Sequence, residues 1–221
     1  MSLKLYVAPG SCALVALWAL ERTAVDYELV SLNLAAGDQR SAAYLAINPH
    51  GRVPALAVDG TVITELNAVL TYLAARFPDS GILPMRDPML LGRAMELLCW
   101  FSSTIHVHVA QTLRGERFTD EADVKERLAA SGKQRLASAL AELEERVAQS
   151  GKYLTSDQFN AVDMFSVVIW RWAQKLQIDS SSLPCWADKI QRDMARPEVV
   201  HALELERSAP PAKWQAETEM S

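Results

Sequence analysis

The chain has 221 residues, half of them apolar, with 22 basic and 27 acidic side chains and a net charge of -5. This much apolar material supplies one large core or two modest ones, and the acidic balance makes nucleic acid an unexpected partner. The first residues lack the pattern of a secretory signal, and no apolar run approaches the ~18 residues of a membrane span. Three scattered cysteines without metal-site spacing are typical of a reducing compartment, so we expect a cytoplasmic protein.

The first 80 residues are predicted to form a mixed α/β domain. Alternating apolar residues indicate strands, and Pro9-Gly10 separates the first strand from an apolar helix. The first two strands with the helix between them make a β-α-β unit, which implies parallel strands. Asp59-Gly60 between two further strands is a strong hairpin signal. The predicted strands cover residues 3–7, 27–30, 54–58 and 61–64, and the predicted helices cover residues 12–20, 42–46 and 65–77.

A polar, proline-containing connection follows, after which no comparable strand pattern returns. We therefore predict a domain over residues 1–80, a linker over 81–88 and an all-helical domain over 89–221. Gly132 interrupts an apolar stripe and should let another helix approach closely. Asn160 and Asp163 have the spacing of a reciprocal helix cap. The predicted helices cover residues 90–114, 120–149, 161–175, 183–195 and 197–206, with an irregular tail around Pro210-Pro211.

Several sequence blocks carry a resemblance to a known family. Residues 6–12 read YVAPGSC, residues 47–56 read INPHGRVPAL, and Thr64-Glu65 follows at a matching distance. In this order they resemble the cytosolic glutathione S-transferases, and the first block is similar to the bacterial beta class. Residues 160–163 (NAVD) and 195–199 (ARPEV) extend the resemblance over nearly the whole chain. It implies a thioredoxin-like N-terminal domain, an all-α C-terminal domain, and a homodimeric detoxification enzyme with glutathione as co-substrate and no metal.

Ser11 and Cys12 are the candidates for handling the glutathione sulfur. They precede a helix directly after a strand, where free N–H groups and the helix dipole favour an anion such as a thiolate. The Ser11 hydroxyl or N–H would stabilise the glutathione thiolate, or Cys12 would ionise and form a mixed disulfide with glutathione. The ordinary alternatives are an N-cap for Ser11 and a small buried apolar residue for Cys12. The sequence leaves these roles open.

Other residues are expected to bind the tripeptide itself. By resemblance, Val53 precedes a cis-proline, Pro54, and its backbone pairs with the cysteinyl unit as an added strand would. Glu65 begins a helix and, again by resemblance, binds the γ-glutamyl ammonium group. Leu66 replaces the serine of the family pattern and leaves only its backbone N–H, for which Asn67 is the expected compensation.

The glycyl carboxylate has a weaker expected site. Beta-class proteins place lysines before the Asn-Pro segment, whereas this chain has Ala36 and Gly37. The nearby substitutes are Arg40, His50 and Arg52.

The beta-class pattern also places a His-Lys pair on the first long helix of the second domain. This chain has His106 and His108 and no lysine in either register, so both histidines stay candidates, with His106 preferred. Residues two apart do not share a helical face, which argues against a metal site here.

Three functions remain in competition. The leading one is conjugation of glutathione to a small apolar electrophile through a stabilised thiolate. The second is Cys12-dependent thiol–disulfide transfer, and the third is a non-catalytic binding protein that retains the fold. Neither nucleic acid nor membrane is an expected partner.

Overall fold

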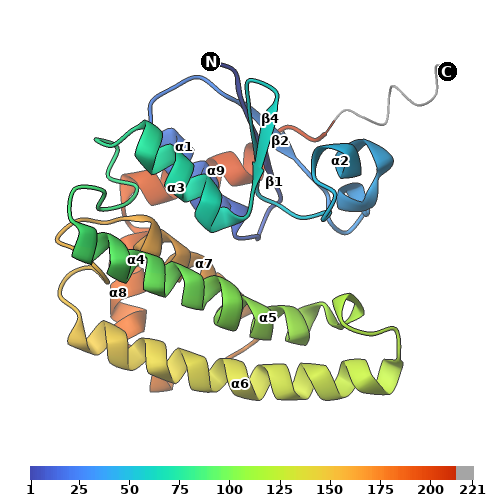
Figure 1. The fold of residues 1–221 in the computed structure, drawn as a ribbon. Helices are drawn as coiled ribbons and strands as arrows, with labels where there is room; N and C mark the ends of the chain where they lie inside the picture. The colour runs from blue at the N-terminus through green and yellow to red at the C-terminus, as the bar shows by residue number, and fades with distance from the viewer. Residues whose placement is uncertain (213–221) are drawn as a thin grey trace. The chain divides into compact units, whose positions relative to one another are not determined.

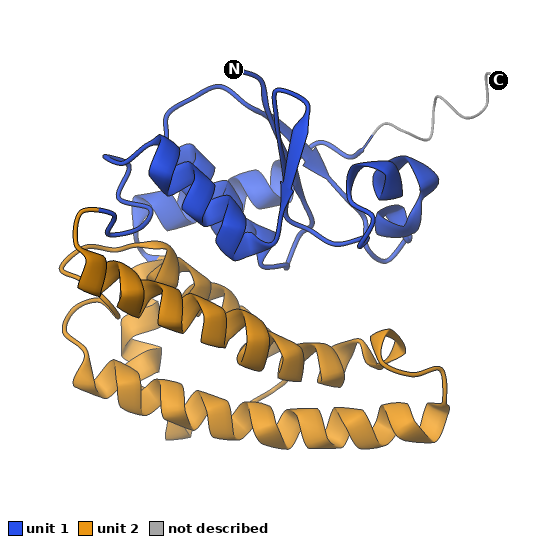
Figure 2. Cartoon of the chain, viewed as in Figure 1, with its two compact units in different colours: residues 1–85, 195–221 blue, residues 86–194 orange. Residues whose placement is uncertain are grey.

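A computed structural model of the chain describes residues 1–212. The remaining residues, 213–221, are the end of the predicted second domain and lie outside the described part. The chain forms two compact units, residues 1–85 with 195–221, and residues 86–194 (Figure 2). The last helix, which the sequence analysis assigned to the second domain, therefore groups with the first unit. Its apolar residues Val199, Ala202 and Leu203 are buried, and the helix packs on the first helix of the chain.

The first unit contains the predicted thioredoxin-like pattern of strands and helices. Element ends differ from the predicted ranges by one residue or less for every strand and for the first three α-helices, within the usual uncertainty of such boundaries. The elements are β1 (Leu3–Val7), α1 (Ala13–Glu21), β2 (Glu28–Ser31), the 3-10 turn η1 (Asp38–Arg40), α2 (Ala42–Ile47), β3 (Ala55–Val58), β4 (Thr61–Thr64), α3 (Leu66–Arg76) and α9 (Pro197–Ser208).

The four strands form one sheet in the order β2-β1-β3-β4. The β1–β2 pair is parallel, as predicted, and the other two pairs are antiparallel. Asp59 and Gly60 both have positive φ, 46° and 86°, as a type I′ hairpin turn requires. At the outer edge, β2 gains backbone hydrogen bonds from the end of the described chain, because Ser31 N–H donates to Pro210 and Ala212 N–H donates to Ser31.

Helices cover both faces of this sheet. Figure 1 shows α1, α3 and α9 on one side and α2 on the other. Helix α1 is apolar on all sides, and Ala13–Leu20 are fully buried, because it lies between the sheet, α3 and α9. On the opposite face, Tyr44 of α2 packs edge-on against Tyr6, with ring centroids 5.7 Å apart.

The second unit is helical. Its elements are α4 (Pro88–Trp100), a π-helical turn η2 (Phe101–Ile105), α5 (His106–Leu113), η3 (Gly115–Arg117), α6 (Ala122–Gln149), α7 (Ala161–Lys175), η4 (Ser180–Ser182) and α8 (Pro184–Met194). The single helix predicted over residues 90–114 is thus divided by a π-helical turn. Ser103 donates its hydroxyl to the Cys99 carbonyl at 2.8 Å, a side-chain bond that competes with regular helical pairing. Among the described residues, no helix is long and apolar enough to cross a membrane.

Two predictions about the second unit are confirmed. A side chain at Gly132 would meet the carbonyl of His108 at 3.0 Å, so the glycine does allow α5 and α6 to approach closely. Asn160 and Asp163 form the reciprocal cap at the start of α7. A third participant, which no local pattern indicates, is Lys189, whose ammonium lies 2.8 Å from Asp163 and also pairs with Asp193.

Candidate functional site

Three segments that carry candidate residues meet at one end of the sheet. Tyr6 of β1 pairs with Ala55 of β3, and Ala55 pairs with Thr64 of β4. Because these pairs are antiparallel, the chain leaving β1, the chain entering β3 and the chain leaving β4 lie at the same end. The structure therefore brings the Ser11-Cys12 turn, Val53-Pro54 and Glu65 to the same end of the sheet.

The turn between β1 and α1 is closed by its own hydrogen bonds. Both the N–H and the hydroxyl of Ser11 donate to the Ala8 carbonyl, at 3.2 and 2.7 Å. The Ser11 oxygen in turn accepts the N–H of Ala13 at 3.2 Å. Ser11 therefore stabilises the turn that leads into α1, and its single hydroxyl proton is directed at Ala8.

Cys12 has a different environment one residue further on. It is buried, with 6% of its surface exposed, and its Sγ lies 3.9 Å from the Val53 carbonyl oxygen. The Val53–Pro54 peptide bond is cis, the state that the resemblance implied. A thiol at the head of α1 thus lies beside the backbone segment on which an extended peptide would pair.

Two buried side chains stabilise the loop from Asn48 to Pro54 through hydrogen bonds. The Tyr44 hydroxyl and the Asn48 amide both donate to the Arg52 carbonyl, at 2.6 and 2.7 Å, and Asn48 Oδ1 accepts the N–H of His50 at 3.1 Å. Burial is the main cause that raises the pKa of Tyr44 above its ordinary value, so the phenol stays protonated and keeps donating. These contacts fix the approach to Val53.

Glu65 has an unusual backbone conformation. Its φ is 66°, in the left-handed region that residues with a side chain rarely adopt, and no side chain caps the turn of α3 that follows. Such outliers concentrate at binding sites. Leu66 is buried, so its side chain belongs to the core and only its backbone remains for a ligand, whereas Asn67 is partly exposed.

The three cationic or polar candidates for the glycyl carboxylate are all exposed. Arg40 ends η1, while His50 and Arg52 lie in the loop before β3. The two segments are in contact, because a side chain at Gly51 would meet the Gln39 carbonyl at 2.7 Å. Gly51 has φ 58°, so both its conformation and its surroundings favour glycine.

His106 and His108 lie on α5 in the second unit. The His106 ring packs on Trp172 with ring centroids 4.6 Å apart. The Nδ1 of His108 lies 3.2 Å from Gln111 Oε1. The two histidines therefore have distinct surroundings, and a role in binding glutathione stays a prediction for both.

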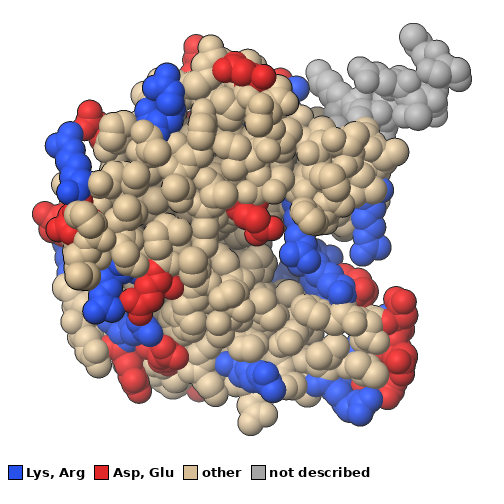
Figure 3. Space-filling view, viewed as in Figure 1, with Lys and Arg blue, Asp and Glu red and all other residues tan. Residues whose placement is uncertain are grey.

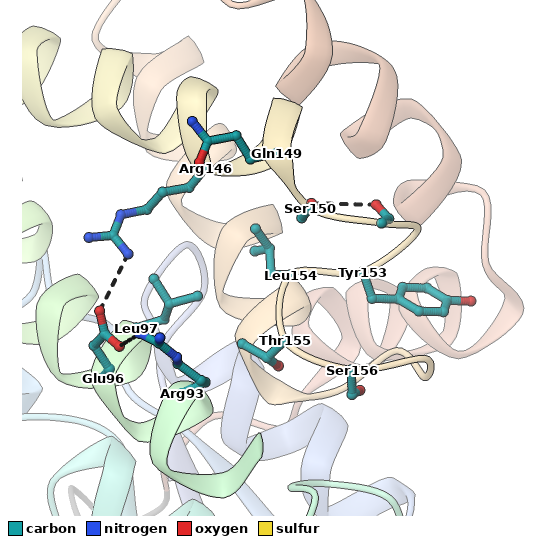
Figure 4. Close-up of a pocket in the computed structure, with 11 residues that line it drawn as sticks. Arg93, Glu96, Leu97, Arg146, Gln149, Ser150, Tyr153, Leu154, Thr155 and Ser156 are labelled. Carbon is teal, nitrogen blue, oxygen red and sulfur yellow. Dashed lines mark hydrogen bonds and ion pairs between the residues drawn. The ribbon is translucent and has the colours of Figure 1, made fainter. Parts of the chain in front are cut away.

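The second unit also contains a hollow of about 450 Å³ beside the end of α6 (Figure 4). Arg93 and Arg146 reach toward the Glu96 carboxylate, at 2.9 and 3.5 Å, and Arg146 also pairs with Glu142 at 2.9 Å. The hydrogen bond from Arg93 is the main cause that lowers the pKa of Glu96. These charges compensate one another, and none of the predicted site residues lines the hollow. On the face drawn in Figure 3, basic and acidic side chains of the described residues are interspersed, without a continuous basic patch.

Sequence reasoning missed the roles of Tyr44, Asn48 and one more residue, Glu206. Asn48 was part of the resemblance, but its contacts with the loop depend on tertiary structure. Glu206 of α9 is 2% exposed, and its Oε1 accepts the N–H of Gly10 at 3.0 Å. No local signal marks this contact, because the two residues are 196 positions apart.

Comparisons with known proteins agree with this arrangement. Residues 1–75 match the family model of the glutathione S-transferase N-terminal domain. Glutathione S-transferase GstA of Escherichia coli O157:H7 is 29% identical over 210 residues, which cover 92% of this chain and 98% of that protein. Glutathione S-transferase hmp2 of Hypomyces subiculosus is 30% identical over 173 residues, or 75% of this chain and 79% of that protein.

A solved structure extends the likeness to the fold as a whole. The glutathione transferase homologue from Sulfitobacter, determined with bound glutathione, superposes with a TM-score of 0.85 at 30% identity and covers 92% of this chain and 97% of its own. Sequence and fold agree along nearly the entire length, and the chain belongs to the glutathione S-transferase family.

Proposed function

We propose that this enzyme binds glutathione along Val53 and joins the intact tripeptide, through its sulfur, to a small apolar electrophile. The observation that carries the proposal is the position of Cys12 Sγ, 3.9 Å from the Val53 carbonyl at the head of α1. A tripeptide paired with the Val53 backbone would bring its own cysteinyl sulfur to this helix end. There the helix dipole favours the thiolate, which is the attacking species.

The proposed conjugation needs one new bond. The glutathione thiol loses its proton to solvent, the thiolate sulfur bonds to the electrophilic carbon, and the leaving group departs with its electron pair. The protein contributes by lowering the pKa of the thiol and by holding the sulfur in place. We propose that the electrophile is apolar, and we name no residue that binds it.

The γ-glutamyl end is proposed to bind at Glu65 and the first turn of α3. The exposed Glu65 carboxylate offers an acceptor for the ammonium group, and the uncapped helix start offers N–H donors for the carboxylate. The positive φ of Glu65 is the feature that favours a binding role over an ordinary first-turn acid. Arg40, His50 and Arg52 are proposed to attract the glycyl carboxylate at the other end.

Of the two sulfur-handling candidates, we favour Cys12. The hydroxyl proton of Ser11 is used by the Ala8 carbonyl and its oxygen by Ala13, so Ser11 has a structural role already. The closeness of Cys12 to Val53 also favours a second activity, thiol–disulfide transfer. In that reaction the Cys12 thiolate attacks glutathione disulfide, a Cys12–glutathione disulfide forms, and one glutathione leaves as the thiolate.

Calorimetric titration with glutathione and an assay with a general aromatic halide electrophile test the proposal. The enzyme should bind glutathione and conjugate it, Cys12→Ala should lose most activity, and Ser11→Ala should retain binding. Cys185→Ala is the matched control, because Cys185 is exposed in the second unit and the neighbouring Glu144 raises the pKa of its thiol. No binding at millimolar glutathione would refute both activities and leave the non-catalytic alternative.

Mass spectrometry after incubation with glutathione disulfide separates the two activities. A single glutathione adduct that disappears in Cys12→Ala supports thiol–disulfide transfer, and conjugation without any adduct supports transfer to electrophiles alone. We further propose that the protein is a homodimer, is located in the cytoplasm and acts in detoxification. Light scattering of the purified protein would test the dimer directly.

A further inference from the structure

We propose that Glu206 is a positioning residue for the sulfur-handling turn and that it acts through the backbone of Gly10. The residue belongs to α9, at the far end of the sequence, yet α9 is part of the same compact unit as α1. Its Oε1 accepts the Gly10 N–H at 3.0 Å, two residues before Cys12. The contact between Glu206 and Gly10 exists without glutathione, and only the expected effect on catalysis rests on the proposed function.

The burial of Glu206 calls for an explanation. Only 2% of its surface is exposed, and a carboxylate is almost never buried to this degree unless it is hydrogen-bonded or paired. A leucine at this position of α9 would extend the apolar surface formed by Val199, Ala202 and Leu203. What the carboxylate adds is a strong acceptor for a backbone N–H, and that N–H belongs to the turn before Cys12.

The turn needs such an outside contact. Gly10 has φ 77°, and because glycine lacks a Cβ, other backbone conformations are also accessible to it at low cost. On the other side of Gly10, the hydrogen bonds of Ser11 go to near neighbours in the chain, Ala8, Ala13 and Leu14. The bond to Glu206 ties Gly10 to a helix packed on α1. Since Cys12 follows directly, this bond holds Cys12 in its buried place beside Val53.

The consequence is a measurable effect on Cys12 itself. With Glu206 in place, Cys12 stays 6% exposed and reacts slowly with reagents from solvent. When the bond to Gly10 is lost, the turn opens more often, and a charge-assisted hydrogen bond is strong enough for an increase of about tenfold in the open fraction. Alkylation of Cys12 by iodoacetamide should accelerate by the same factor.

The experiment uses the full chain with Cys99→Ser and Cys185→Ser, so that Cys12 is the sole remaining thiol. In this background Glu206→Ala removes the acceptor, Glu206→Gln keeps an oxygen acceptor without the charge, and Glu206→Asp withdraws the oxygen by one methylene. We expect alkylation about tenfold faster for Ala, clearly faster for Asp, and within about twofold of the parent for Gln. The Asp and Gln variants keep the test informative if the Ala variant does not fold.

Glu198→Ala is the matched control, because Glu198 is another α9 carboxylate and pairs with Arg196 at 2.7 Å rather than with the turn. It should leave alkylation of Cys12 unchanged. A purely structural role for Glu206 predicts a lower melting temperature in the Ala and Asp variants with no change in alkylation at a temperature where all variants are folded. That result would overturn the inference.

Titration with glutathione, run on the same variants, separates this inference from the proposed function. Failure of the parent to bind glutathione, combined with the expected alkylation pattern, refutes the function and supports the positioning role. Binding and conjugation by the parent, with alkylation equal in all Glu206 variants, supports the function and refutes the positioning role. If both hold, Glu206→Ala should lower kcat for conjugation, and Glu206→Gln should restore most of it.

Discussion

The Arg52 carbonyl accepts two side-chain hydrogen bonds in the loop before β3, which allows a quantitative prediction. Tyr44 and Asn48 both donate to the Arg52 carbonyl, at 2.6 and 2.7 Å. Tyr44→Phe removes one donor while the other remains, so the carbonyl stays paired and the free energy of unfolding should fall by only about 1 kcal/mol. Asn48→Ala also loses the bond to the His50 N–H and should cost about 2 kcal/mol.

The double variant is the informative one. With both donors gone, the Arg52 carbonyl loses both side-chain partners, and the cost should exceed the sum of the two single changes by roughly 1 kcal/mol. Urea unfolding followed by circular dichroism measures all three values. Glutathione affinity should fall by about fivefold in Tyr44→Phe if the full 1 kcal/mol acts on the loop.

Tyr72→Phe is the control for this cycle. Tyr72 belongs to α3 in the same unit, and its hydroxyl has no hydrogen-bond partner in the described part of the chain. Its loss should change stability by less than about 0.5 kcal/mol. Strict additivity of the Tyr44 and Asn48 changes, within about 0.3 kcal/mol, would refute the idea that the two side chains share one acceptor.

Three further predictions follow from other contacts. Lys189→Met removes the ammonium group that pairs with two buried aspartates and should lower the free energy of unfolding in urea by about 3–5 kcal/mol. The exposed control Lys175→Met should change it very little. A decrease below about 1 kcal/mol for Lys189→Met would contradict the buried network. Gly51→Ala combines a φ of 58° with a clash against Gln39 and should cost more than about 2 kcal/mol, while Gly92→Ala, in an open helical position, should be neutral or stabilising. Burial raises the pKa of the Tyr44 phenol in the folded protein. The stabilisation by Tyr44 is therefore fully present below the unfolded pKa of about 10 and declines as the pH rises above that value. Tyr44→Phe should flatten this decline in the free energy of unfolding, and an unchanged slope against pH would contradict the role of the buried phenol.

Local sequence was enough to predict the strands and α-helices of both units, apart from the π-helical turn that divides the helix predicted over residues 90–114. Alternation, the Asp-Gly turn and the apolar helix after Pro9-Gly10 depend on interactions between near neighbours, and the observed strands lie within one residue of the expected ranges. The cap formed by Asn160 and Asp163 is local in the same sense. Once these strands pair, the loops that carry Ser11-Cys12, Val53 and Glu65 lie at one end of the sheet.

Only the tertiary structure decided which groups touch. The sequence left Ser11 and Cys12 as equal candidates, and our proposal of Cys12 rests on the contact of its Sγ with the Val53 carbonyl, 41 positions away. The contact between Gly10 and Glu206, and the grouping of α9 with the first unit, join residues almost two hundred positions apart. Such contacts leave no periodic trace in the chain, because a glutamate in a helix has the same local sequence pattern whether its carboxylate meets solvent, a lysine or a backbone N–H. The sequence thus determined the strands and helices and their order, whereas only the packing of distant segments decided that Glu206 accepts the Gly10 N–H, because that contact requires the folded chain.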